Sequence, residues 1–359
     1  MNLKGKMLSQ NRLGLDRFWN FSRDGIDNFR TGLRDAVSGV EQTRSRMMEY
    51  DQLLVWAVLS LMLIGLVMVY SASITLADGP KYANYSSNFF LIRHLISLAI
   101  ATGVGVWVFK IPSKVWDRYS PVIFGFTVVL LVLVLIPGVG KGVNGARRWI
   151  PLGIMNFQPS ELMKFAAVIF AASYTVQRQE YLHSFSKGML PMGIAVALVG
   201  GLLMKEPDMG AFVVVAIIAF GILFLGGINA KLFGGLLLVG LLSGAAMIAL
   251  SPFRRERMLA FMDPWQVDNA ANKGYQLTHS LMAFGRGEWF GTGLGGSVEK
   301  LHYLPEAHTD FIMAVIGEEL GFVGVVVMIF LFYWIVRRAF MIGRTALQLD
   351  RSFAGLAAK

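Results

Sequence analysis

The chain has 359 residues, of which 55% are hydrophobic and 16% are charged, and its net charge is +10. A soluble globular domain carries about 25% charged residues. This composition therefore excludes an ordinary soluble enzyme and indicates an integral membrane protein. The sequence contains no cysteine, which excludes disulfide bonds and thiolate metal sites.

Eight hydrophobic runs approach or exceed the ~20 residues that a helix needs to cross a bilayer core. The runs at 162–176 and 211–225 are the shortest. None shows the alternating pattern, in segments of about ten residues, that is typical of a membrane β-barrel. We therefore predict an all-α polytopic integral membrane protein with eight spans, at residues 52–73, 89–109, 119–136, 162–176, 189–204, 211–225, 232–250 and 311–336.

Most Lys and Arg residues fall in segments that successive spans would place on one side of the membrane. These segments are residues 1–51, 110–118, 177–188, 226–231 and 337–359. Short cytoplasmic loops carry an excess of Lys and Arg, so these segments are predicted to be cytoplasmic and the loop 251–310 external. The positive charge is then a topology signal, and no nucleic-acid partner is predicted.

The spans and loops divide the chain into four predicted parts. They are a basic cytoplasmic segment (1–51), a membrane domain with spans one to seven (52–250), a large external loop (251–310) and span eight with a cytoplasmic tail (311–359). Apolar residues from Phe18 to Val37 recur at roughly helical spacing among arginines. The first part is therefore either an amphipathic helix lying on anionic lipid or a mobile tail.

An external segment with unusual composition follows the third span. Closely spaced glycines between residues 137 and 145 exclude a continuous helix there. Arg147, Arg148 and Trp149 come next, and they either bind an anionic headgroup or anchor the chain at the membrane surface. Lys164 lies about one turn inside the next hydrophobic run. A buried charge in a membrane is costly and marks a functional candidate, unless the side chain reaches back to the surface.

The loop 251–310 holds the longest polar interval between hydrophobic runs, so aqueous chemistry is expected there. Arg254, Arg255 and Arg257 begin it, and the planar guanidinium suits phosphate because it donates two hydrogen bonds at once. Asp263 and Asp268 follow on either side of a Pro-Trp pair that interrupts helix. The simpler alternatives are arginines at a membrane boundary and aspartates that cap turns.

The end of the loop brings Glu306, His308 and Asp310 to the entrance of the last hydrophobic run. They are candidate substrate-binding residues, although a polar collar at a helix start would look the same. Histidines with metal-ligand spacing are absent, and no glycine-rich nucleotide motif occurs. No metal site is predicted.

Several motifs resemble one family of membrane proteins. The run from Gly274 to Gly324, which contains LPEAHTDF, is similar to the SEDS family (shape, elongation, division and sporulation proteins), and most similar to its cell-division branch. The motifs QPSEL at 158–162, EPDMG at 206–210 and YSAS at 70–73 occur in the family's order. The resemblance covers about residues 50 to 356.

The resemblance implies a multi-pass protein of the bacterial cytoplasmic (inner) membrane at the division septum. It further implies a peptidoglycan glycosyltransferase that polymerises lipid II and works with a class B penicillin-binding transpeptidase and other division proteins. In that interpretation Asp268 is the catalytic base, and the substrate-binding residues are Arg148, Lys164, Arg254, Arg257, Glu306, His308 and Asp310. Whether a divalent cation takes part is left open. The alternatives are a lipid II carrier or flippase, and a division scaffold without chemistry.

Two features depart from the family pattern. The family typically has ten spans, whereas this sequence ends at Lys359, where a ninth span would be expected to begin, so the chain is expected to be truncated. The family's catalytic Asp precedes Pro, whereas Asp268 precedes Asn269 and it is Asp263 that precedes Pro264. Asp263 is therefore the alternative base.

Overall fold

The computed structural model describes residues 50–78, 86, 88–143, 146–151 and 156–359. The chain divides into two compact units, Met1–Trp56 and Ala57–Lys359. Of the first unit only residues 50–56 are described, and they lead into the first described helix, so the account below concerns the second unit. The apolar residues from Phe18 to Val37, predicted to form an amphipathic helix or a tail, lie outside the described residues.

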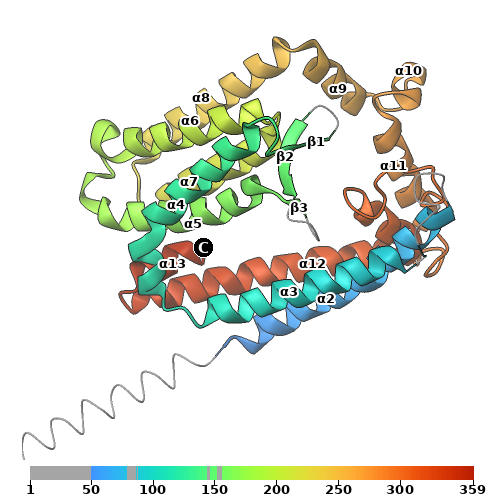
Figure 1. The fold of residues 1–359 in the computed structure, drawn as a ribbon, viewed down its shortest axis with the longest axis horizontal. Helices are drawn as coiled ribbons and strands as arrows, with labels where there is room; N and C mark the ends of the chain where they lie inside the picture. Colours follow the sequence, from blue (N-terminus) through green and yellow to red (C-terminus); the bar gives the residue numbers. More distant parts are fainter. Residues whose placement is uncertain (1–49, 79–85, 87, 144–145, 152–155) are drawn as a thin grey trace, which may run out of the picture. The chain divides into compact units, whose positions relative to one another are not determined.

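Each predicted hydrophobic run coincides with one long helix, which confirms the all-α polytopic fold (Figure 1). Six helices of the described part are long and apolar enough to cross a membrane, and α7 is a shorter apolar helix. The eight helices are α2 (Gln52–Ser73), α3 (Phe89–Phe109), α4 (Ser113–Leu135), α5 (Pro159–Gln177), α6 (Leu190–Lys205), α7 (Met209–Leu225), α8 (Ala230–Ala249) and α12 (Ile312–Gln348).

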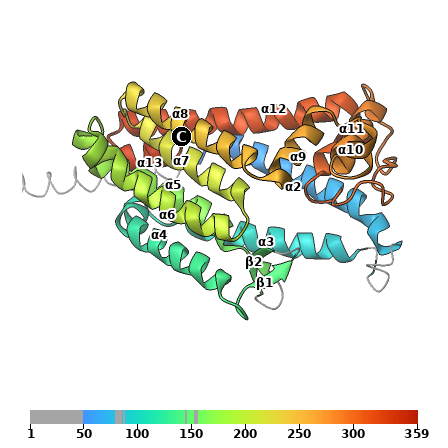
Figure 2. The same cartoon turned by 90° about the horizontal axis from the view of Figure 1, so that it is seen from above.

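Helices α4 to α7 form the best-packed part of the molecule. They run side by side in Figures 1 and 2, with α5 packed against both α4 and α7 and α6 packed against α7. Apolar side chains such as Leu131, Met163 and Leu203 are fully buried between them. Short turns at η2 (Gln179–Tyr181) and η3 (Phe185–Met189) connect α5 to α6.

The C-terminal region is more ordered than a tail. Helix α12 continues past the predicted end at Val336 to Gln348, because a helix outside the apolar region needs no hydrophobic residues to extend. The short helix α13 (Ser352–Ala357) then folds back onto α5, and Leu356 is buried in the same core as Leu182. The division of the chain into four domains stays a prediction.

A small antiparallel sheet, which the sequence did not predict, lies in the segment between α4 and α5. Its strands are β1 (Lys141–Val143), β2 (Ala146–Pro151) and β3 (Asn156–Phe157), in the order β1-β2-β3. Lys141 pairs with Trp149, and Ile150 pairs with Phe157. The predicted absence of a helix in this segment is confirmed for its described residues.

The loop before α12 is itself partly helical. It contains α9 (Pro252–Met262), α10 (Val267–Ala271) and α11 (Tyr275–Gly287), and α11 packs along α12. Near the start of the described chain, the short 3-10 helix η1 (Ile74–Asp78) directly follows the last residue of α2.

Helix α12 is interrupted at Gly321, whose backbone (φ 67°, ψ −166°) is not helical. The carbonyls of Glu318 and Glu319 accept hydrogen bonds from the amides of Thr292 and Gly293, at 2.9 and 3.1 Å. The amides after the break donate back to the carbonyls of residues 288 and 289, at 2.9 and 3.2 Å. The segment after α11 thus satisfies the backbone groups that the break would leave without partners.

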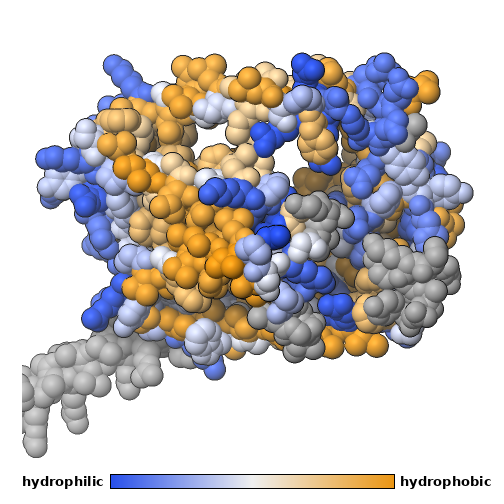
Figure 3. All heavy atoms as spheres, turned by 45° about the horizontal axis from the view of Figure 1, so that its top comes forward, coloured by the Kyte–Doolittle hydropathy of each residue, from blue (hydrophilic) through white to orange (hydrophobic). Residues whose placement is uncertain are grey.

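The surface agrees with a membrane protein. Helices α3 and α8 contain no buried residue, although their sequences are almost wholly apolar. In Figure 3, hydrophobic side chains cover the middle of the face and hydrophilic ones gather towards both sides. Such apolar helix faces are suited to lipid rather than to water.

Candidate active site

Asp268, the predicted base, lies in the first turn of α10, and its side chain is exposed. Hydrogen bonds fix the segment around it. The side-chain amide of Asn269 donates to the Asp263 carbonyl at 2.9 Å, and the hydroxyl of Thr278 in α11 donates to the Pro264 carbonyl at 2.9 Å. A carboxylate is thus presented to solvent on a short helix, and both bonds hold the turn that leads into that helix.

Asp263 ends α9 and is also exposed. Its backbone carbonyl takes part in the turn that leads to α10. Among the described residues neither the Asp263 nor the Asp268 carboxylate has a side-chain hydrogen bond, so neither carboxylate caps a helix. The geometry leaves both carboxylates accessible to a substrate hydroxyl.

The predicted arginines lie on α9, the helix that precedes this turn. The Arg257 guanidinium stacks 4.7 Å from the centre of the Phe253 ring, which holds it close to the helix surface. Arg254 is half-buried, and its Nη1 lies 3.5 Å from the Met247 carbonyl. Both side chains keep donors that are available to an anion.

A second group of polar residues joins β2, α5 and the turn between α6 and α7. Arg148 donates from Nε to the Glu206 carbonyl at 3.0 Å and from Nη2 to the Pro207 carbonyl. The QPSEL and EPDMG motifs are in contact here, since the Ser160 hydroxyl lies 3.3 Å from Asp208 Oδ2. Arg148 therefore supports this turn, and only the donors that do not bind the turn could bind a ligand.

Asp208 explains why the turn has this sequence. Its Oδ1 accepts the amide of Ala211 at 3.1 Å and so caps the start of α7. Its Oδ2 also lies 3.4 Å from the side-chain amide of Gln158. The Asp208 carboxylate thus holds together the turn between α6 and α7.

Glu206, the neighbouring acid, is fully buried. Neither of its carboxylate oxygens has a hydrogen-bond partner among the residues that the structure describes. Burial, reinforced by the adjacent Asp208 carboxylate and opposed by the Arg148 guanidinium, raises the pKa of Glu206 from 4.5 to about 8. The side chain is therefore expected to be largely protonated at neutral pH.

This pKa gives a prediction for stability. Between pH 4.5 and about 8 the unfolded chain releases the Glu206 proton while the folded chain keeps it. The contribution of Glu206 to stability is therefore fully present below this window and is lost as the pH rises through it. We expect the melting temperature of the wild type to fall across this window more steeply than that of Glu206→Gln, measured in detergent by intrinsic fluorescence. Parallel curves for the two proteins would contradict the assignment.

The other predicted site residues occupy two further places. Lys164, in α5, forms an ion pair with Glu161 one turn earlier, with Nζ 2.7 Å from Oε2. At the entrance to α12, Glu306 accepts a hydrogen bond from the Thr309 hydroxyl at 2.9 Å, and the His308 ring packs edge-on against Phe90. Asp310 is exposed.

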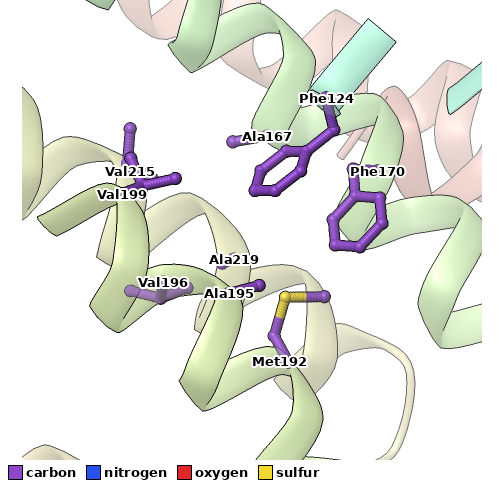
Figure 4. A pocket seen from close by; sticks show the side chains of 9 residues that line it. All are labelled: Phe124, Ala167, Phe170, Met192, Ala195, Val196, Val199, Val215 and Ala219. Atoms are coloured by element: carbon purple, nitrogen blue, oxygen red, sulfur yellow. The ribbon is translucent and has the colours of Figure 1, made fainter. Parts of the chain in front are cut away.

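The structure thus distributes the predicted residues over separate groups on the sheet, on α5, on α9 and α10, and before α12. Figure 2 shows this separation, with the sheet drawn below α9 to α11 in that view, and Figure 3 shows openings in the face turned towards the viewer. An apolar crevice lies elsewhere, among α4 to α7, and Phe124, Phe170 and Met192 are among its wholly apolar lining (Figure 4). It offers no group for acid-base chemistry.

A group that the sequence analysis missed lies between the ends of α2 and α11 and the start of α12. It consists of Ser71, His279, Ser297, Glu299, Lys300, Glu318 and Glu319. Ser71 of the YSAS motif and Lys300 lie 229 positions apart, so no local sequence pattern joins them. Within the described part of the chain, no three His, Asp or Glu side chains are grouped to hold a metal ion.

Comparison with known proteins explains the order of these motifs. A family described as cell cycle protein, FTSW_RODA_SPOVE, matches residues 52–359. The chain belongs to this family. The resemblance to SEDS proteins is therefore confirmed over all eight helices.

Individual relatives agree with this assignment. The chain is 91% identical over 359 residues to the probable peptidoglycan glycosyltransferase FtsW of Polynucleobacter necessarius subsp. necessarius (strain STIR1), covering 100% of this chain and 85% of that protein. It is 63% identical over 328 residues to the protein of the same name from Burkholderia thailandensis, covering 91% of this chain and 71% of that protein.

Solved structures share the fold of this SEDS chain. One, described as "Structural coordination of polymerization and crosslinking by a peptidoglycan synthase complex", superposes with a TM-score of 0.65 at 26% identity and covers 87% of this chain and 84% of that one. The crystal structure of Thermus thermophilus rod shape determining protein RodA gives a TM-score of 0.57 at 25% identity, covering 87% and 81%.

Proposed function

We infer that the chain is a peptidoglycan glycosyltransferase that polymerises lipid II into glycan strands during cell division. The observation that carries this conclusion is the 91% identity, over the whole chain, to a relative named for that activity. The structure supports it with an exposed carboxylate, Asp268, that follows an arginine-bearing helix on the polar side of the spans.

The substrate has three chemically distinct parts, and the chain offers a partner for each. The apolar helix faces suit the undecaprenyl tail. Arg254 and Arg257 suit the pyrophosphate, because guanidinium groups donate paired hydrogen bonds to phosphate oxygens. The polar loop that contains Glu306, His308 and Asp310 can contact the sugars and the peptide.

The proposed reaction is a single displacement. The Asp268 carboxylate accepts the proton of the acceptor sugar's 4-hydroxyl while that oxygen attacks the anomeric carbon of the donor. The bond from this carbon to the lipid pyrophosphate breaks, and the pyrophosphate leaves with the electron pair. An α-linked donor then gives a β-1,4 bond, so one base suffices and the paired carboxylates of a glycosidase are not required.

The expected partners follow from the product. Glycan strands must be crosslinked, and a related structure is described as coordinating polymerization with crosslinking. We therefore propose that the chain works with a class B penicillin-binding transpeptidase and other division proteins. Its location would be the bacterial cytoplasmic membrane at the septum.

One observation favours the alternative of a lipid carrier. Transporters often bind substrates at broken helices, and α12 is broken at Gly321. However, the segment 288–293 hydrogen-bonds to the backbone on both sides of this break and fills it. A filled break leaves no room for a substrate, so the enzyme is the better interpretation.

Reconstitution separates the possibilities. The purified protein, inserted in liposomes with its transpeptidase partner and labelled lipid II, is expected to produce polymeric glycan. Movement of the lipid II headgroup across the bilayer without polymer would indicate a carrier instead. If neither polymer nor movement were detected, the protein would be a scaffold.

The arginines give a prediction about substrate use. In Arg254→Lys and Arg257→Lys the charge is kept but the paired donors are lost, so we expect the KM for lipid II to rise about tenfold, the equivalent of ~1.4 kcal/mol, with normal membrane insertion. Arg148→Lys should also lower the melting temperature, because it loses its bonds to the Glu206–Pro207 turn. Arg255→Lys, on the same helix, is the matched control. If the KM were unchanged in the variants of Arg148, Arg254 and Arg257, these arginines would be interfacial anchors.

A further inference from the structure

The four residues from Ser297 to Lys300, which follow the glycine-rich stretch, form hydrogen bonds to the start of α12. We call these four residues the clasp. The Ser297 hydroxyl donates to Glu318 Oε2 at 2.5 Å, the Val298 amide donates to Oε1 at 2.9 Å, and the Glu299 amide lies 3.3 Å from Oε2. Glu318 is fully buried and Ser297 almost so. A buried carboxylate with three donors from one segment fixes that segment on α12.

The last residue of the clasp makes a buried ion pair. Lys300 Nζ lies 2.6 Å from Glu319 Oε1, and it also donates to the Ser71 hydroxyl at 3.1 Å. Ser71 in turn donates to Glu319 at 2.7 Å. Thr75, beyond the end of α2, donates to the Lys300 carbonyl at 3.1 Å. Lys300 thus joins the clasp to α2 as well as to α12.

The third residue of the clasp reaches the helix next to the candidate base. Glu299 Oε2 lies 2.6 Å from His279 Nδ1 in α11. The residue before His279 is Thr278, whose hydroxyl donates to the Pro264 carbonyl in the turn before α10. One turn of α11 therefore connects the clasp to the segment that carries Asp268.

We propose that Glu299 and Lys300 are positioning residues for glycosyl transfer, which fix α11, and through it Asp268, relative to α2 and α12. This proposal rests on the proposed function. A reacting group that is displaced by 1 Å can cost about a hundredfold in rate. In this proposal, the contacts of the clasp with α2, α11 and α12 determine the position of Asp268.

A purely structural role is the competing explanation, and the energetics of buried charges help to separate the two. A buried ion pair often adds little net stability, since desolvation opposes the attraction, whereas removing one partner alone is costly. Replacing both charges of the Lys300–Glu319 pair by neutral groups should therefore leave a folded protein. Its activity then reports on position rather than on folding.

The experiment uses the full chain with its transpeptidase partner and labelled lipid II. In Glu299→Ala we expect kcat to fall at least tenfold, with KM near wild type. Glu299→Gln, which can still accept a hydrogen bond from His279, should restore most of the activity. The double variant K300M/E319Q keeps an acceptor for Ser71 and should also fold with a kcat lowered at least tenfold.

A distance measurement tests position directly. Because the sequence lacks cysteine, spin labels can be attached at Val267 and Met341, both exposed. We expect a broadened or shifted distance distribution in Glu299→Ala and a wild-type distribution in Glu299→Gln. Activity within twofold of wild type in Glu299→Ala would overturn the proposal, and so would lost activity with an unchanged distribution. Absence of polymer from the wild type would instead refute the proposed function, which the distance measurement does not depend on.

Discussion

Asp268→Asn is expected to abolish polymerisation of lipid II while leaving the complex with the transpeptidase intact. The amide has nearly the shape of the carboxylate but cannot accept the acceptor's proton, and loss of a general base costs about 10²- to 10⁴-fold in rate. Because the Asp268 side chain is exposed, the substitution should not change the melting temperature. Single-turnover polymerisation assays with labelled lipid II measure the effect.

Asp263→Asn is the matched control, since Asp263 is equally exposed and lies in the same turn. It should retain most of the activity. The opposite pattern would assign the base to Asp263, and two active variants would refute an aspartate mechanism in this segment.

The long helices could be predicted from hydrophobicity because their boundaries are chemically sharp. The predicted limits of α2 and α3 agree with the structure, and polar residues, Asn88 and Lys110, flank α3 on both sides. Helix α12 shows the limit of the method. Its interruption at Gly321 lies inside a run that hydropathy treats as one continuous span, and its extension to Gln348 continues past Arg337 and Arg338, where hydropathy predicts an end.

The sheet was not predicted for a related reason. Its strands are short, and β2 carries two arginines and a proline rather than an alternating apolar pattern. Pairing with its neighbours, which depends on register, holds it in place. Glycine content indicated that a helix was absent but gave no information about which residues would pair.

The candidate site was predictable by residue type but not by contact. Arg254, Arg257 and Asp268 lie close in sequence, so their chemistry was visible in the loop. The contact between Ser71 and Glu319 spans 248 positions, and no local pattern predicts it. The structure adds a contact that the sequence did not indicate, since two donors of Arg148, a predicted substrate-binding residue, bind the Glu206–Pro207 turn.

Gly321→Ala is expected to have the largest effect on folding. The backbone angles at Gly321, φ 67° and ψ −166°, lie in a region essentially limited to glycine. A Cβ atom there would overlap the backbone of Phe290 and Gly291, which fill the break. Separating the two segments would expose backbone groups that have no water to replace their partners, at several kcal/mol each. We expect little folded protein after detergent extraction, measured by size-exclusion chromatography.

Gly234→Ala is the matched control for this experiment. Gly234 lies inside α8, where an added Cβ would meet no atom within 4 Å. Alanine in place of a helical glycine should stabilise the chain by about 0.5–1 kcal/mol. If Gly321→Ala instead folded and polymerised like the control, the segment 288–293 could leave the break without loss of function. The filling of α12 would then no longer argue against a carrier, and the headgroup-translocation assay would have to decide between the two functions.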